Sequence, residues 1–162
     1  MRVPSASLFY TGSDGLGMLI ALTGTPGTGK STVALGLQAR GWNVLEVNDL
    51  AKRHGLLRCK DPTRDSYDLD LDELQEALER EGFQDGVLVG HLSHLLDVDM
   101  VIVLRRHPEV LARRLESRKW SLAKVRENAL AESLDIILAE AVDSGAPVFE
   151  VDTTELSPPE TE

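Results

Sequence analysis

The stretch LTGTPGTGKST, residues 22–32, decides the fold of this 162-residue chain. It contains the pattern G-x-x-x-x-G-K-[ST], from Gly24 to Ser31, between a short apolar run and a helix-forming segment. In such a loop the backbone N–H groups point at phosphate oxygens, and the N-terminus of the following helix adds partial positive charge. The sequence therefore predicts a nucleoside triphosphate site. A glycine-rich turn with an incidental lysine, the alternative, does not explain the strand and helix signals that flank the pattern.

Two side chains of this stretch supply charge and metal chemistry. Lys30 provides a point charge for the β- and γ-phosphates, and the hydroxyl of Ser31 can reach a magnesium ion. We therefore expect ATP and Mg²⁺ as the ligands of the loop.

The composition indicates one acidic globular domain. Of the residues, 42% are hydrophobic, and the formal net charge is −10, which argues against binding to naked DNA or to an anionic membrane surface. No apolar run approaches the ~18 residues of a membrane-spanning helix. The single cysteine, Cys59, excludes an internal disulfide and has no matched partner, so it fits a reducing, cytoplasmic location.

The ends of the chain are predicted to lie outside the fold. Residues 1–17 are rich in Ser and Gly and lack the apolar centre of a signal peptide, so we expect a disordered extension or a true start at Met18. The folded domain is expected over 18–156, followed by a tail at 157–162.

Strands and helices are expected to alternate along this domain. Continuous apolar runs predict buried parallel strands at 18–22, 43–47, 86–90, 100–104 and 147–151. Helices are predicted at 30–40, from an Asn48-Asp49 N-cap to 53, at 71–81, at 108–117, and from Ser121 to near Gly145. Residues 55–70 are expected to be irregular. This alternation predicts the α/β three-layer sandwich of P-loop NTPases, with a five-stranded parallel sheet and its ligand at the carboxyl ends of the strands.

From Met18 to about Asp152 the chain resembles the adenylate kinase isoenzyme 6 family, which includes archaeal homologues. The resemblance rests on five stretches, GTPGTGKST at 24–32, VNDLAK at 47–52, GHLSH at 90–94, VIVLR at 101–105 and LARRLESR at 111–118. It implies a nucleoside monophosphate kinase with broad acceptor tolerance and ATPase activity. It also implies a role in maturing the small ribosomal subunit, through contact with a ribosomal protein and the end of its rRNA.

The resemblance also implies site residues. The matching ATP-binding positions are Gly27, Gly29, Lys30, Ser31 and Thr32, with Ser31 as the metal ligand and Lys30 also catalytic. An acceptor-binding segment is implied at 46–69 and a short lid at 117–127.

In this lid, Arg118 matches an arginine that binds ATP and neutralises charge in the transition state. Alternatively, three arginines form a solvated helix face paired with Glu109 and Glu116; they are Arg113, Arg114 and Arg118.

Two further candidate catalytic residues follow strands. Asp49 comes after the second strand, where it could hold the acceptor or the water shell of magnesium, or simply cap a helix. His91 follows the third strand, where the family carries an acid–x–His motif. Here the acid is replaced by Val89, so either Asp49 and solvent suffice or hydrolysis is slow. His94 is interpreted as a structural or surface residue.

Three functions remain open from the sequence. The first is transfer of phosphate from ATP to AMP, giving two ADP, by positioning and charge neutralisation. The second is a ribosome-assembly ATPase, for which the acidic chain suits a basic small-subunit ribosomal protein on a pre-ribosomal particle. The third is another small-molecule kinase, of shikimate or gluconate type. It is disfavoured because no obvious basic cluster lies between residues 55 and 90.

Overall fold

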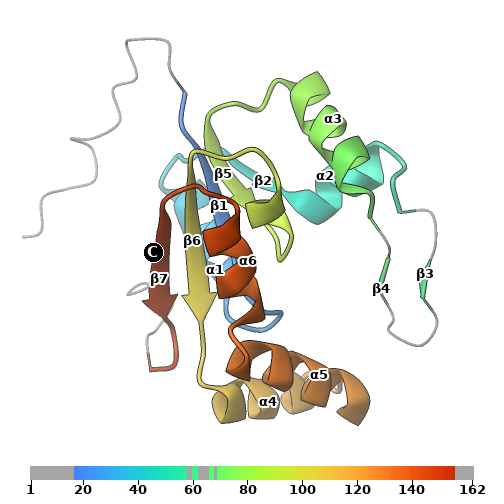
Figure 1. Cartoon of the computed structure of the whole chain (residues 1–162), viewed down its shortest axis with the longest axis vertical. Helices are drawn as coiled ribbons and strands as arrows, with labels where there is room; N and C mark the ends of the chain where they lie inside the picture. The colour runs from blue at the N-terminus through green and yellow to red at the C-terminus, as the bar shows by residue number, and fades with distance from the viewer. Residues whose placement is uncertain (1–16, 58–59, 62–65, 68, 156–162) are drawn as a thin grey trace, which may run out of the picture.

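The computed structural model describes residues 17–57, 60–61, 66–67 and 69–155 (Figure 1). The predictions made for residues 1–16, for 156–162 and for Cys59 lie outside these ranges. Within them, the predicted order of strands and helices is confirmed, with the differences given below.

The centre of the molecule is a five-stranded parallel sheet, as predicted. Its strands lie in the order β2-β5-β1-β6-β7, and every pairing between neighbours is parallel. Their bounds are β1 Leu19–Thr23, β2 Val44–Glu46, β5 Gly86–Val89, β6 Met100–Arg105 and β7 Val148–Asp152. The order reverses at β1, so β1 lies at the point where ligands bind in open α/β sheets.

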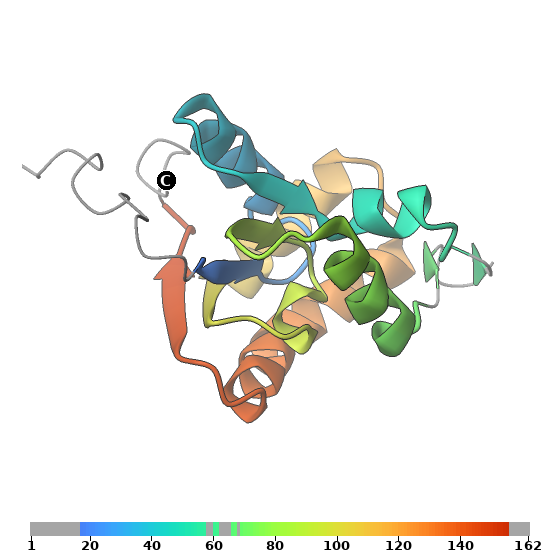
Figure 2. The ribbon, with the colours of Figure 1, turned by 90° about the horizontal axis from the view of Figure 1, so that it is seen from above.

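Helices cover both faces of the sheet and make a three-layer sandwich (Figure 2). Their bounds are α1 Lys30–Ala39, α2 Val47–Arg53, α3 Leu71–Glu81, α4 Pro108–Ser117, α5 Leu122–Ser133 and α6 Ile136–Asp143, with a short 3-10 turn at Ser93–Leu95. One face is covered by α1. The other is covered by α2 and α3 near β2 and by α6 near β6 and β7, while α4 and α5 lie beyond the carboxyl ends of the strands (Figure 1).

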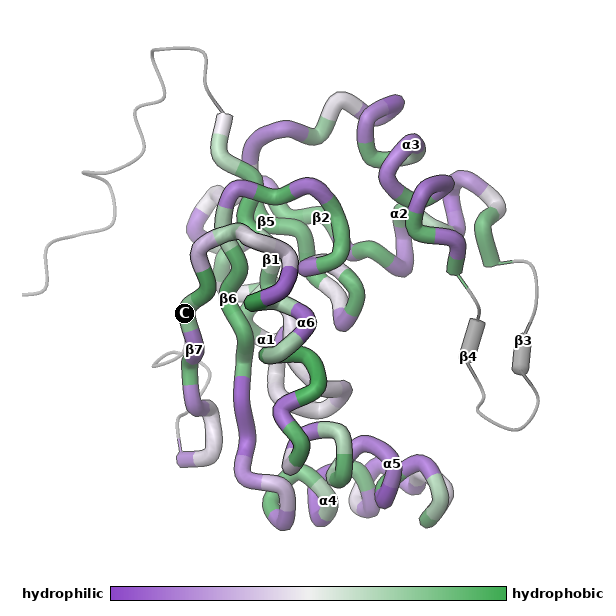
Figure 3. The backbone as a smooth tube through the Cα atoms, viewed as in Figure 1, coloured by the Kyte–Doolittle hydropathy of each residue, from purple (hydrophilic) through white to green (hydrophobic). Residues whose placement is uncertain are grey.

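The core has two sides because successive strand residues point to opposite faces. In β1, Ile20 and Leu22 pack under α1 with Val33, whereas Leu19 packs towards α2 and α3, and Ala21 towards α6. Every residue of β1 is buried. Figure 3 shows the consequence, with apolar residues concentrated in the central strands and mixed apolar and polar residues along α3 and α5.

The bounds predicted for α3 and α4 are confirmed, and local residues account for them. Asp70 accepts hydrogen bonds from the backbone N–H groups of Asp72 and Glu73 at the start of α3. The same helix ends at Gly82, whose φ of 64° is readily adopted by glycine. Pro108 occupies the first turn of α4, which ends at Ser117 as predicted.

The long helix predicted from Ser121 to near Gly145 is wrong, because the chain breaks into α5 and α6. Asp135 lies between them with a φ of 54°, a conformation that a non-glycine residue rarely adopts. Its carboxylate is paired with Arg105 at the end of β6. The break is therefore held by a contact from 30 residues away, which helical periodicity cannot reveal.

Two predictions for the region after β2 are also wrong. The helix α2 begins at Val47 with Glu46 at the N-cap position, so Asn48 and Asp49 lie inside the first turn instead of capping it. The segment expected to be irregular contains a small antiparallel hairpin, β3 Lys60–Asp61 and β4 Ser66–Tyr67. In the described part of the chain no helix has the length and apolar character needed to cross a membrane.

Candidate nucleotide-binding site

A cavity of about 680 Å³ opens at the carboxyl ends of the strands, where the fold predicts the ligand. Its volume is in the range of small-molecule sites. Three groups of residues line it. The loop and α1 contribute Thr25 to Gly27 and Gly29 to Thr32; the strand ends and predicted acceptor segment contribute Glu46, Asn48, Leu57, Leu69, Gly90 and His91; the predicted lid and the helices after it contribute Arg118, Trp120, Lys124, Glu127, Asn128, Ala131 and Ile137.

The phosphate-binding loop requires glycine at two points. Gly24 has a φ of 139°, and a Cβ atom there would lie 2.3 Å from the carbonyl oxygen of Leu104. Gly27 has a φ of 99°, and its Cβ would lie under 3 Å from the side chains of Leu111 and Leu115 on α4. The loop therefore turns tightly against β6 and packs directly on the helix that leads to the predicted lid.

Lys30 is the charged group at the centre of the loop. Its Nζ donates hydrogen bonds to the carbonyl oxygens of Gly24, at 2.6 Å, and Thr25, at 3.1 Å. Burial lowers the pKa of Lys30 to about 8, although the carboxylates of Glu46 and Glu132 oppose this shift. The ammonium group is therefore poorly solvated, and phosphate oxygens in the cavity would gain an unusually strong partner.

The loop also offers hydroxyl groups suited to a hard cation. Ser31 and Thr32 lie in the first turn of α1, and both line the cavity beside Lys30. Hydroxyl and carboxylate oxygens are the ligands that Mg²⁺ accepts, usually with several waters and the substrate phosphates. Ser31, together with a carboxylate that lines the same cavity, therefore fits a magnesium–nucleotide complex. Among the described residues no group of three or more His, Cys, Asp or Glu side chains could hold a metal alone.

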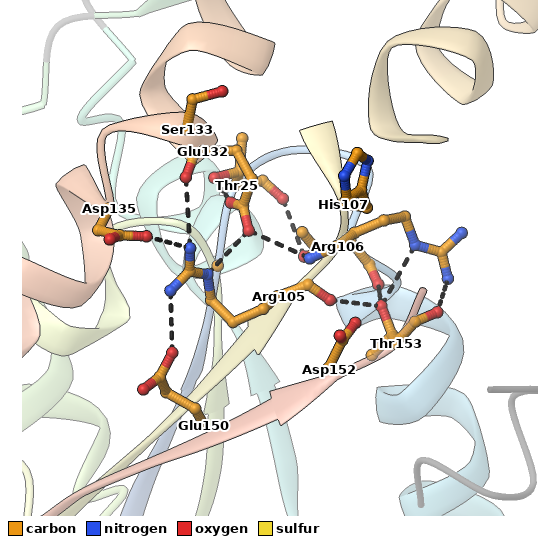
Figure 4. A network of polar contacts seen from close by, with 12 residues as sticks. Thr25, Arg105, Arg106, His107, Glu132, Ser133, Asp135, Glu150, Asp152 and Thr153 are labelled. Carbon is orange, nitrogen blue, oxygen red and sulfur yellow. Dashed lines mark hydrogen bonds and ion pairs between the residues drawn. The ribbon is translucent and has the colours of Figure 1, made fainter. Parts of the chain in front are cut away.

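A buried carboxylate of α5 holds the first half of the phosphate-binding loop (Figure 4). Glu132, near the end of α5, is only 4% exposed and accepts a hydrogen bond from the hydroxyl of Thr25. It also accepts from Arg105 Nε, at 2.8 Å, and from the backbone N–H of Arg106, at 3.1 Å. Arg105 in turn pairs with Asp135 and Glu150. A single network thus joins the loop to β6, β7 and the break between α5 and α6.

The end of β7 holds the second half of the loop. The hydroxyl of Thr153 is 2.8 Å from the carbonyl oxygen of Thr28 and 2.9 Å from that of Arg105. Arg106 donates to Thr153 through Nε and Nη2, at 3.2 Å and 2.5 Å. The loop conformation is therefore held by hydrogen bonds from residues 107 and 125 positions away, and Thr153 carried no sequence signal for this role.

Arg118 lines the cavity at the end of α4, as expected for a lid residue that faces a nucleotide. The alternative of a solvated, ion-paired helix face is supported only in part: Arg113 and Arg118 are exposed, but among the described residues none of the three arginines pairs with Glu109 or Glu116. Arg113 donates instead to the backbone carbonyl of Glu109. Burial and the charges of Arg106 and Arg118 lower the pKa of Arg114, so three guanidinium groups lie close enough to repel one another. Such a cluster of positive charges favours the binding of an anion.

The two histidines after β5 have different surroundings. His91 lines the cavity and keeps an exposed edge. Desolvation of the ring and the nearby charge of Lys30 lower the pKa of His91, so the imidazole is mostly neutral at pH 7. His94 is fully buried, with Nδ1 2.9 Å from the hydroxyl of Thr23 and Nε2 3.2 Å from Glu140. His94 is therefore a structural residue, one of the two alternatives considered.

The cavity collects every candidate from the sequence except Asp49. The side chain of Asp49 is 63% exposed, points to Lys52 at 3.3 Å and does not line the cavity. Glu46, three residues earlier, does line it and was not predicted. Position at a strand end was the available signal for Glu46, but the sequence alone did not show which face of β2 it occupies.

Comparisons with known proteins show the family of this chain and its fold. A family model described as an AAA domain matches residues 20–135. A protein of Archaeoglobus fulgidus named "Putative adenylate kinase" is 49% identical over 140 residues, covering 86% of this chain and 75% of its own. A Pyrococcus furiosus protein of the same name is 45% identical, covering 88% and 79%. Among solved structures, the deoxyadenosine kinase of M. mycoides with bound dATP has a TM-score of 0.53 at 16% identity, covering 89% of this chain and 95% of its own.

The fold and site define a P-loop kinase, a phosphotransferase with an α/β three-layer core. The chain belongs to the adenylate kinase-like family represented by these archaeal relatives, which confirms the resemblance found in the sequence.

The buried charge of Lys30 predicts proton uptake when ATP binds at alkaline pH. With a pKa of about 8, Lys30 is mostly neutral at pH 9.5 in the free protein, and bound phosphates restore its proton. Calorimetric titration with ATP in buffers of different ionisation enthalpy should therefore give an uptake approaching one proton at pH 9.5 and much less at pH 7. The variant Lys30→Arg keeps its charge at both values, so it should take up none from this position at pH 9.5. Equal uptake by both proteins at pH 9.5 would contradict the assignment.

Of the three carboxylates that pair with Arg105, a buried one and an exposed one are predicted to affect stability unequally. Glu132→Gln removes a buried charge that also binds Thr25, and should lower the free energy of unfolding by about 1–3 kcal/mol in urea titrations. Glu150→Gln is the matched control, because its side chain is 50% exposed. This variant should lower the free energy of unfolding by less than about 1 kcal/mol. Equal losses in the two variants would show that the buried network does not anchor the loop.

Proposed function

We propose that this protein transfers the γ-phosphoryl group of ATP to a nucleoside monophosphate, with AMP as the preferred acceptor and ADP as the product on both sides. The observation that carries this proposal is the single cavity that joins the phosphate-binding loop to the predicted acceptor segment and lid. A nucleotide on Lys30 and an acceptor beside Leu57 and Leu69 would meet within this one cavity.

The donor half of the cavity is supported by its charge. Lys30 and the N-terminus of α1 attract the β- and γ-phosphates. Arg118 approaches from the lid, with Arg114 and Arg106 adding positive charge behind it. These groups neutralise charge that spreads over the transferring phosphoryl in the transition state. Positioning and neutralisation suffice, so no covalent intermediate is invoked.

The acceptor half is supported by its mixed character. Leu57 and Leu69 offer apolar contact to a base, and Asn48 offers an amide that can hydrogen-bond. His91, mostly neutral at pH 7, lines the cavity between the two halves and can donate or accept a hydrogen bond there. Mg²⁺ bound with ATP would offset the charge of the phosphates. The hydroxyl of Ser31 would hold it.

ATP hydrolysis is included in the proposed activity. Water that reaches the γ-phosphoryl can take the place of the acceptor, and the cavity is open to solvent. We expect hydrolysis to be slower than transfer, because no carboxylate ends β5 to orient that water: Val89 is buried in the core beneath α1.

A coupled assay of ADP formation from ATP and a panel of monophosphates tests the proposal. Wild-type protein should be fastest with AMP. Arg118→Ala should lower kcat by about 10²-fold or more, since it removes a charged donor to the transition state. Arg113→Ala is the matched control on the same helix and should leave kcat within about twofold, because Arg113 does not line the cavity. ATP binding without ADP formation from any monophosphate would reject the proposal.

A second role, in maturation of the small ribosomal subunit and its rRNA, is proposed on the surface character of the chain. The net charge of −10 suits a basic protein partner better than bare RNA. Exposed apolar side chains on and after α5 offer contact area for a protein; they are Leu122, Leu130, Leu134 and Ile136.

Purification from native lysate tests this role. The protein should co-purify with a small-subunit ribosomal protein or pre-ribosomal particles at moderate salt and lose them at high salt, because screening weakens charge attraction. Purification without either at moderate salt would reject the second role and leave the kinase proposal unaffected.

A further inference from the structure

The strand that should supply an acid to the phosphate site carries none. At the end of β5, Val89 is 1% exposed and packs with Leu22 and Val33 under α1. A carboxylate at this position would be directed towards α1, the helix that begins with Lys30 and Ser31. Any negative charge beside Lys30 and Ser31 must therefore come from another element.

The neighbouring strand offers a carboxylate at the same level. In the β2–β5 pairing, Glu46 is the register partner of Val89. Partners in neighbouring parallel strands point to the same face of the sheet and lie about 4.8 Å apart. Glu46 is thus displaced by one strand spacing from the position of the absent acid, and it faces the same side of the sheet as Val89.

The surroundings of Glu46 agree with this placement. It is half-buried and lines the cavity together with Lys30 and Ser31. Across the described residues its carboxylate has no hydrogen bond or ion pair, although it is close enough to Lys30 for each charge to act on the other. Burial and the charge of Asp49 raise the pKa of Glu46, which shows a carboxylate without adequate solvation or partners.

Asp49 is the competing source of negative charge and is less suited. It is exposed, its carboxylate is occupied by Lys52 at 3.3 Å, and it does not line the cavity. The other carboxylate that acts on Lys30, Glu132, is fully engaged with Thr25, Arg105 and Arg106. Glu46 is the remaining carboxylate with free acceptor atoms among those that act on Lys30.

We infer that Glu46 supplies the acid that β5 lacks, by accepting hydrogen bonds from the water shell of the magnesium ion that accompanies ATP. This role rests on the proposed kinase function, because it needs a magnesium–ATP complex at Lys30 and Ser31. Glu46 is a positioning residue: it contacts metal-bound water and neither the phosphoryl group nor the ion. Carboxylates in such outer positions typically account for 10- to 100-fold in metal affinity.

Equilibrium binding of a non-hydrolysable ATP analogue, with Mg²⁺ or with EDTA, tests the inference without relying on turnover. In wild-type protein Mg²⁺ should strengthen binding, and in Glu46→Gln this gain should fall by about tenfold or more. Binding in EDTA should stay equal or become tighter, because a negative charge near the phosphates is removed. Glu76→Gln, an exposed carboxylate of α3 paired with Arg80, is the control and should keep the full gain.

Three results would overturn the inference. One is a full magnesium-dependent gain in Glu46→Gln. Another is loss of the gain in Asp49→Asn instead, which would assign the role to Asp49. The third is a Glu46→Gln protein with the gain intact and weaker AMP binding, which would make Glu46 an acceptor contact. A wild-type protein that fails to bind the analogue at all would contradict the proposed function itself.

Discussion

The buried positive charge of Lys30 is the constraint on which the rest of the site depends. Its ammonium group leaves bulk water and is held by two carbonyl oxygens of its own loop, with Glu46 and Glu132 nearby. Burying a cation is costly unless neighbouring groups compensate. The loop, the end of β2 and the end of α5 therefore have to meet around the Nζ atom of Lys30, and the cavity forms where they meet.

The loop keeps its shape because distant elements bind its backbone and side chains. Glu132 holds Thr25, Thr153 holds the carbonyl oxygen of Thr28, and Arg105 connects both anchors through β6. Since Gly27 packs directly on Leu111 and Leu115 of α4, a movement of the lid would be transmitted to the loop. The same contacts that stabilise the fold thus connect the part that binds phosphate with the part that closes over it.

The sequence predicted most of the fold and much of the site, for local reasons. Apolar runs, the glycine pattern, Gly82 and Pro108 act through neighbouring residues, so the strands, the loop and these helix ends could be predicted. The break at Asp135 could not, because Arg105 fixes it from another element. Glu46 was missed and Asp49 was taken as the candidate acid for a related reason, because only the β2–β5 register shows which acid faces the loop. The periodicity of apolar residues along the sequence does not reveal such long-range contacts.

The central claim is that one cavity holds donor and acceptor nucleotides together around Lys30. Calorimetric titration with a bisubstrate analogue, two adenosines joined by five phosphates, tests this most directly. We predict a 1:1 complex that is at least about 10²-fold tighter than that of ATP or AMP alone, because both halves are engaged by one molecule. An analogue that binds no more tightly than ATP, and leaves AMP free to bind beside it, would contradict the account.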